Sequence, residues 1–229
     1  MKFYTDYNKL YYERKYFSKR HVVRYVKFML KDRAKLKWLD IGCGLGYLVK
    51  ELIEEGIDVY GIEISEYALK DSLVKERIKY GSITNIPFHN NSFDVISAFD
   101  VLEHIHPRDT LRAIHEVHRV LKSGGIFIMT TPNPCYFGDW IYDLTHINVR
   151  PPKYWKMILE NQGFKVKMKY VPSFLKYYII YKFKYPSLRR FIEPISDKLV
   201  FKLEEPLRYI LGRLFSRRGR LYILAIKLR

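Results

Sequence analysis

The strongest constraint on the fold of this chain lies between residues 37 and 48, where a short apolar run ends in an acid and three glycines follow at alternate positions. The segment reads KWLDIGCGLGYL, and an amphipathic stretch from Tyr47 to Glu55 begins at once. This order predicts a strand, a tight turn and a helix, the opening unit of a nucleotide-binding α/β fold. Glycine suits the turn because it accepts a sharply turned backbone and lets a ligand approach closely.

Asp40, two residues before the first glycine, discriminates between classes of ligand. A dinucleotide site spaces its glycines GxGxxG and holds a pyrophosphate at the helix N-terminus. The spacing here is GxGxG, and a carboxylate at the mouth would repel phosphate, which argues against a nicotinamide oxidoreductase. An acid suits a ligand that carries an amine or a sulfonium. The segment resembles the first motif of class I S-adenosylmethionine-dependent methyltransferases, D/E-x-G-x-G-x-G, and more broadly the type 11 and the ubiquinone- and saccharide-type O-methyltransferases.

The resemblance implies S-adenosyl-L-methionine as cofactor and S-adenosyl-L-homocysteine as product. It places Asp40 near the methionine amino group and Glu63, at the end of the second strand, on the ribose hydroxyls. Ser82 stands where the family usually has an aspartate for the adenine, so a hydroxyl or the Ile83 amide would substitute. The alternative for both acids is a solvated charge at a strand end. The expected cofactor-binding residues are Asp40, Gly42, Cys43, Gly44, Gly46, Glu63, Ile64, Ser82, Ile83, Phe99 and Asp100.

Two further segments are candidates for chemistry on the methyl acceptor. Residues 99–105 resemble the family's V-L-E-H segment, which implies that Glu103 and His104 face the acceptor. Residues 143–148 resemble the D-x-x-H-x-N segment of small-molecule and saccharide-type methyltransferases, and His146 is our candidate general base because imidazole titrates near neutrality. The alternative for His146 is a structural histidine that ties down a loop. The expected catalytic residues are His146, His104 and Glu103.

A metal site formed by Glu103, His104 and His106 is not expected. Three ligands so close in sequence rarely point in the same direction, and a metal site needs its ligands to converge on one point. We therefore expect no metal cofactor.

The spacing of apolar residues predicts an α/β fold. The expected fold is Rossmann-like, with a seven-stranded, mostly parallel sheet and helices on both faces. The resemblance implies that the last strand is antiparallel. The expected strands are 36–41, 58–63, 78–80, 92–99, 126–130, 164–171 and 221–228, and the expected helices are 46–55, 66–76, 108–121 and 152–161. We expect residues 1–229 to form a single methyltransferase domain, made of N-terminal helices over 1–35, a catalytic core over 36–171 and 220–229, and a basic, aromatic, helical insertion over 172–219.

The net charge of +17 is unevenly spread along the chain. Residues 1–37 carry +9, residues 38–150 carry −6 and residues 151–229 carry +14. Basic flanks favour anionic partners, either a phospholipid surface or nucleic acid, although a generally Lys- and Arg-rich proteome gives the same pattern. The segment 172–219 is expected to act as a lid over the site, a dimer contact or a contact with an anionic membrane.

Two cysteines and a charged N-terminus favour a cytoplasmic protein, with peripheral membrane contact as a further option. No stretch approaches the roughly 20 apolar residues of a membrane span. The expected activity is O-methylation of a small, saccharide-linked or lipid-linked acceptor. The alternatives are an RNA methyltransferase that uses the basic flanks, and a non-catalytic protein that binds S-adenosylmethionine; nucleic acid is the less favoured partner because no RNA-binding module is recognisable. The sequence does not predict an oligomeric state.

Overall fold

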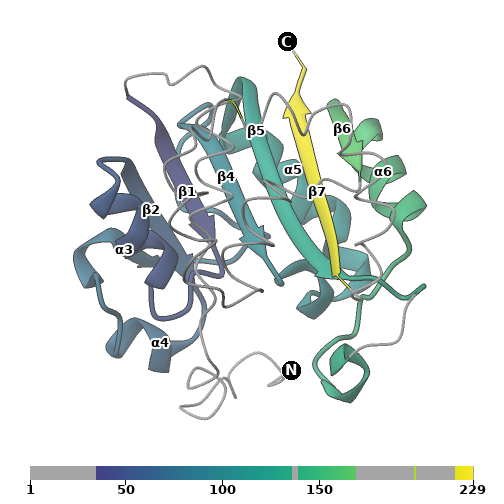
Figure 1. Ribbon diagram of the computed structural model, residues 1–229, viewed down its shortest axis with the longest axis horizontal. Helices are drawn as coiled ribbons and strands as arrows, with labels where there is room; N and C mark the ends of the chain where they lie inside the picture. The colour runs from purple at the N-terminus through teal and green to yellow at the C-terminus, as the bar shows by residue number, and fades with distance from the viewer. Residues whose placement is uncertain (1–34, 136–138, 169–198, 200–219, 229) are drawn as a thin grey trace.

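The computed structural model describes residues 35–135, 139–168, 199 and 220–228, and these residues form one sheet with helices packed on both faces (Figure 1). The expected N-terminal helices lie outside the described residues, as do the expected insertion, apart from Leu199, and the end of the strand expected over 164–171. Within the part of the chain that is described, no helix is long and apolar enough to cross a bilayer.

Seven strands make up the sheet, in the order β3-β2-β1-β4-β5-β7-β6. Their bounds are β1 Lys37–Ile41, β2 Asp58–Glu63, β3 Ile78–Tyr80, β4 Phe93–Phe99, β5 Leu121–Pro132, β6 Phe164–Met168 and β7 Arg220–Lys227. Strand β7 pairs antiparallel with both β5 and β6, whereas the remaining neighbours pair in parallel. The expected fold class is therefore confirmed.

Within the described residues, four α-helices and four short 3₁₀ helices connect the strands. The α-helices are α3 Tyr47–Glu54, α4 Glu66–Lys70, α5 Thr110–Val120 and α6 Pro152–Asn161, and the 3₁₀ helices are η1 Lys75–Arg77, η2 Leu102–His104, η3 Pro107–Asp109 and η4 Asp139–Tyr142. Strand β2 and helix α6 have the bounds that the sequence predicts.

The helix expected over residues 66–76 is wrong in its second half, because α4 ends at Lys70. The following residues bond elsewhere: the Leu73 amide donates to the Leu45 carbonyl (3.0 Å), and the Val74 amide donates to Ser72 Oγ (3.1 Å). These bonds fold residues 71–74 against the glycine turn. Strand β5 is also longer than expected, since its pairing with β4 and β7 extends beyond residues 126–130.

The core consists of two apolar layers, one on each face of the sheet. Trp38 of β1 packs in the layer that includes Leu48 and Leu52 of α3. Its neighbour Leu39 packs in the opposite layer, which includes Ile114 of α5 and residues of α6. This alternation is expected for a strand buried on both faces, and it leaves the strand ends as the places where polar side chains gather.

The carboxyl ends of the parallel strands share one edge of the sheet, where ligands bind in open α/β folds. Strand β7 begins at this same edge, because Arg220 is paired with Pro132 at the end of β5. Strand β6 also ends there, where Met168 pairs with Ile223 of β7. The chain therefore leaves β6 and enters β7 at the edge that carries the candidate site.

Candidate functional site

The glycine turn between β1 and α3 has a left-handed backbone. The φ angles of Gly42, Gly44 and Gly46 are 65°, 54° and 83°, values that side chains disfavour. The amides of Gly42 and Cys43 donate to the Ile62 carbonyl at 2.9 and 3.2 Å, which fixes the turn against the end of β2. The sharp turn expected from the sequence is confirmed.

Close packing within the protein is a second reason for glycine in this turn. A Cβ on Gly42 would lie 2.6 Å from Val101 Cγ2, and a Cβ on Gly46 would lie 2.8 Å from both Ile78 Cδ1 and Val74 Cγ2. The sequence suggested that the glycines make room for a ligand. At these two positions they also make room for neighbouring side chains.

Glu63, at the end of β2, binds the glycine turn through its carboxylate. Its Oε2 accepts a hydrogen bond from the Gly44 amide (2.8 Å), and its Oε1 accepts from the amides of Ile64 (2.7 Å) and Ser65 (3.0 Å). The side chain is buried, so it is not the solvated strand-end charge of the alternative interpretation. A carboxylate accepts about four hydrogen bonds, and these three leave capacity for one further donor.

Asp40, near the end of β1, is also buried. Its Oδ1 accepts a hydrogen bond from Ser97 Oγ (2.6 Å), and Ser97 Oγ accepts one from Trp38 Nε1 (2.8 Å). This chain of bonds crosses from β1 to β4, where Asp40 and Ser97 are register partners. Sequence reasoning missed Ser97, although a lone serine within the apolar strand DVISAF was a usable signal.

Cys43 lies in the turn as a small, buried residue. Burial and the nearby carboxylates of Asp40 and Glu63 raise the pKa of its thiol well above the usual value, so the reactive thiolate is disfavoured. The interpretation of Cys43 as a turn residue rather than a nucleophile agrees with this environment.

The segment expected beside the adenine follows β3. Ser82 Oγ lies 2.9 Å from Thr84 Oγ1 and accepts from the Thr84 amide at 3.2 Å, so its hydroxyl takes part in a local turn. Ile83 contributes its side chain to the core. The predicted contact of the Ser82 hydroxyl or of the Ile83 amide with the adenine stays a prediction.

Asp100, directly after β4 and Phe99, has a left-handed backbone with φ of 57°. Thr130 of β5 holds this conformation: its carbonyl and Oγ1 accept from the Asp100 amide at 3.0 and 3.1 Å, and Oγ1 donates to Asp100 Oδ1 at 2.8 Å. Left-handed non-glycine residues are costly and concentrate at functional sites. The predicted contact of Phe99 and Asp100 with the methionine moiety stays a prediction.

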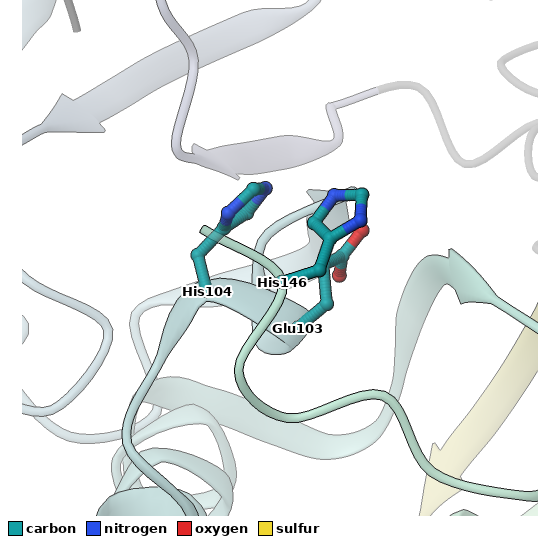
Figure 2. Close-up of side chains that lie close together, drawn as sticks. All are labelled: Glu103, His104 and His146. Atoms are coloured by element: carbon teal, nitrogen blue, oxygen red, sulfur yellow. The ribbon is translucent and has the colours of Figure 1, made fainter. Parts of the chain in front are cut away.

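Glu103 and His104 lie on η2, and His146 reaches them from the loop after η4. One ligand atom from each of the three side chains lies within 4.8 Å of the others. Figure 2 shows the three side chains on the same side of η2, with the carboxylate of Glu103 next to the ring of His146. We call this group the Glu–His–His cluster. The structure thus brings together the three residues predicted to be catalytic.

His104 is nearly buried and carries a defined tautomer. Thr145 Oγ1 donates its proton to Asp143 Oδ1 (2.5 Å), so it accepts from His104 Nδ1 (2.9 Å). The Nε2 atom of His104 therefore holds the lone pair. Burial, and next the neighbouring His146, lower the pKa of His104 to about 4, which keeps the ring neutral at physiological pH.

His146 lies beside His104 with a ring-centroid distance of 4.8 Å. Its Nε2 is 3.7 Å from Asp143 Oδ2, so Asp143 is adjacent to both histidines. Its side chain is mostly buried, at 12% exposure.

Asn148 is the residue that joins the His146 loop to η2. Its amide donates to the Glu103 carbonyl (2.9 Å), and its Nδ2 donates to the Leu102 carbonyl (3.1 Å) and to Thr110 Oγ1 (3.0 Å). Sequence reasoning included Asn148 in a motif and assigned it no role. These bonds explain how a loop distant in sequence places His146 beside η2.

The glycine turn and the Glu–His–His cluster are neighbours. Val101, which contacts the position of a Gly42 Cβ, directly precedes η2. Asp100 is close enough to His104 to influence its pKa. The expected donor and acceptor residues therefore occupy one continuous region at the carboxyl edge of the sheet.

The chain is similar to known proteins in sequence and in fold. A family model described as a methyltransferase domain (Methyltransf_23) matches residues 12–168. The uncharacterized protein MJ0638 of Methanocaldococcus jannaschii is 28% identical over 187 residues, which are 81% of this chain and 76% of that protein. The mouse mitochondrial arginine-hydroxylase NDUFAF5 is 33% identical over 110 residues, which are 46% of this chain, so the match spans only 30% of that relative. A crystal structure of a SAM dependent methyltransferase from Archaeoglobus fulgidus has a TM-score of 0.66 at 23% identity, with 97% of this chain and 100% of that chain covered.

Proposed function

The chain belongs to the S-adenosylmethionine-dependent methyltransferase family, and on that premise we propose that it methylates a hydroxyl oxygen of a small, saccharide-linked or lipid-linked acceptor. The cofactor is S-adenosyl-L-methionine, which becomes S-adenosyl-L-homocysteine. One observation carries the choice of a hydroxyl acceptor: the Glu–His–His cluster lies beside the glycine turn.

The donor side supports a cationic ligand. Two buried carboxylates, Asp40 and Glu63, lie at the ends of adjacent parallel strands, and S-adenosylmethionine carries a sulfonium and an ammonium. In the proposal Asp40 faces the amino group, and the remaining capacity of Glu63 accepts a ribose hydroxyl. The glycine turn lies between them, bonded to Glu63 through the Gly44 amide.

The acceptor side supports proton removal. Methyl transfer is an in-line displacement in which positioning supplies most of the rate, yet a neutral hydroxyl must also lose a proton. The lowered pKa of His104 makes it a poor proton acceptor near neutral pH, which leaves His146 as the proposed base. The hydroxyl oxygen attacks the methyl carbon, the carbon–sulfur bond breaks with its electrons remaining on sulfur, and the proton passes to His146.

The test is methyl transfer from labelled S-adenosylmethionine by the full-length protein to a panel of hydroxyl acceptors in three classes: small molecules, saccharides and lipid-linked saccharides. The label is expected in an O-methyl product. His146→Ala should lower turnover at least tenfold, an effect typical of a general base, with little change in donor affinity. His89→Ala, at an exposed histidine, is the matched control. Unchanged turnover of His146→Ala on the identified acceptor would remove His146 from the mechanism.

A second candidate is methylation of RNA, favoured by the charge of +14 on residues 151–229. RNA therefore belongs in the same panel, and its binding should weaken steeply with salt. Binding to anionic vesicles tests the alternative partner proposed for residues 172–219.

Because the mouse relative is named a hydroxylase, donor binding without any methyl transfer would point to another reaction or to a non-catalytic role.

A further inference from the structure

The Glu–His–His cluster has the composition of a metal site. Its potential ligand atoms are one carboxylate oxygen and two imidazole nitrogens, all within 4.8 Å of one another. Two histidines and one carboxylate form a donor set that binds zinc and other divalent transition metals while leaving coordination positions open. The Glu103 side chain is fully buried, and fully buried glutamates are rare in proteins.

The spacing of these atoms is close to what a cation requires. Ligands about 2.1 Å from a tetrahedral ion lie roughly 3.4 Å apart. The largest separation in the cluster, 4.8 Å, therefore has to shorten by about 1.4 Å when an ion binds. In Figure 2 the three side chains already extend to the same side of η2.

The surroundings of His104 match those of a metal-binding histidine. Such a residue usually donates its second ring N–H to a neighbouring oxygen, which fixes the tautomer and the ring orientation. His104 Nδ1 donates to Thr145 Oγ1, which in turn donates to Asp143 Oδ1. Because Nδ1 carries the proton in this relay, Nε2 is the ring atom of His104 that would coordinate the ion.

The third ligand differs from the one considered at the sequence level. His106, two residues after His104, accepts a bond from the Arg108 amide at the start of η3 and is not part of the cluster. His146 takes its place because Asn148 holds the His146 loop against η2. Three ligands from one short segment rarely point in the same direction. In the cluster only Glu103 and His104 come from one segment, and the third ligand, His146, comes from a separate loop.

We propose that Glu103, His104 and His146 bind a divalent transition-metal ion whose open position takes the hydroxyl oxygen of the methyl acceptor. The role of the ion rests on the proposed O-methylation, whereas its binding does not. The ion lowers the pKa of the bound hydroxyl. As a ligand of the ion, His146 no longer serves as the base, so the hydroxyl proton passes to solvent instead. The oxygen attacks the methyl carbon, and the carbon–sulfur bond breaks with its electron pair on sulfur.

The test is direct metal binding by the full-length protein after chelator treatment. Zn²⁺ is titrated by calorimetry, and Co²⁺ is followed by its visible absorption. The wild type should bind one equivalent, and Glu103→Gln, His104→Gln and His146→Gln should each bind at least tenfold more weakly. Thr145→Val, which removes the relay, should weaken binding about tenfold. His106→Gln is the matched control and should bind as the wild type does.

Donor affinity, measured on every variant with S-adenosylhomocysteine, confirms that each one is folded. Equal Zn²⁺ affinity of wild type and Glu103→Gln, with donor binding intact in both, would overturn the metal site and leave the proposed methyl transfer standing. Metal binding that depends on all three ligands, in a protein that transfers no methyl group to any hydroxyl acceptor, would uphold the site and refute the proposed function. A loss in His106→Gln equal to that in His104→Gln would also count against the assigned ligands.

Discussion

The Gly44 amide donates a 2.8 Å hydrogen bond to Glu63 Oε2 and so ties the glycine turn to the end of the neighbouring strand. Glu63, which is proposed to bind the cofactor, therefore also fixes the position of the glycine turn. A substitution at Glu63 removes both effects at once.

Glu63→Ala is expected to abolish detectable donor binding, and Glu63→Gln to weaken it at least tenfold. Glutamine keeps the shape but replaces one acceptor oxygen by a donor, which faces the amides of Gly44 or of Ile64 and Ser65. Calorimetry with S-adenosylhomocysteine measures the affinity. Glu66→Gln, at an exposed position on α4, is the control. Tight binding by both Glu63→Ala and Asp40→Ala would disprove the assigned donor site.

Gly42→Ala should destabilise the protein more than Gly56→Ala. Both glycines have positive φ, at 65° and 73°, so both substitutions carry backbone strain of about 1–2 kcal/mol. Only Gly42 has a side chain in the way, Val101 at 2.6 Å, whereas nothing lies within 4 Å of a Cβ on Gly56. Urea denaturation should show an extra loss of at least about 1 kcal/mol for Gly42→Ala.

A second substitution isolates the clash. Val101→Ala in the Gly42→Ala background should recover most of the extra loss, because it removes Cγ2. Additive effects of the two substitutions would show that the close approach of Val101 is not the cause.

Ser97→Ala is expected to lower the free energy of unfolding by about 1–3 kcal/mol. The substitution leaves the buried Trp38 Nε1 without its acceptor and takes one donor from Asp40. Donor affinity should fall as well, since Asp40 loses the bond that orients it. Ser92→Ala, which removes an exposed bond to the His89 carbonyl, serves for comparison. Equal stability of the two variants would contradict the buried relay.

The stability of the metal-free protein should fall as the pH is lowered from about 6.5 towards 4. His104 has its pKa lowered from 6.5 to about 4 in the folded chain. The unfolded chain therefore binds a proton in this window that the folded chain does not, and stability rises with pH there by up to about 1.4 kcal/mol per pH unit. Urea denaturation in the presence of EDTA measures the slope. His104→Gln should show a shallower slope, and an identical slope would exclude His104 as its source.

The sequence predicted the fold because the signals that set it are local. The glycine turn after β1 and the helix over residues 152–161 depend on backbone preference and on the spacing of apolar residues within a few turns of chain. The helix over 66–76 failed where a tertiary bond, from the Leu73 amide to the Leu45 carbonyl, competed with helix propensity.

The sequence motifs indicate which residues belong to the candidate site, but they do not predict which side chains contact one another there. The motifs predict Asp40 at the end of the first strand and His104 after the fourth, and in the structure Asp40 lies near the end of β1 and His104 on η2, after β4. The partnership of Asp40 with Ser97 depends on the register between β1 and β4, and the meeting of His146 with Glu103 depends on the bonds of Asn148. Neither register nor loop placement follows from the spacing of residues in a single chain.

Strands β6 and β7 are antiparallel neighbours, although 51 residues, 169–219, separate them in the sequence. Neighbouring antiparallel strands can be joined by as few as two residues, so this segment is not needed to bridge Met168 and Arg220. Met168 and Arg220 both lie at the edge of the sheet that carries the candidate site. Shortening the segment between them is therefore expected to leave the pairing of β6 with β7 and the glycine turn unchanged.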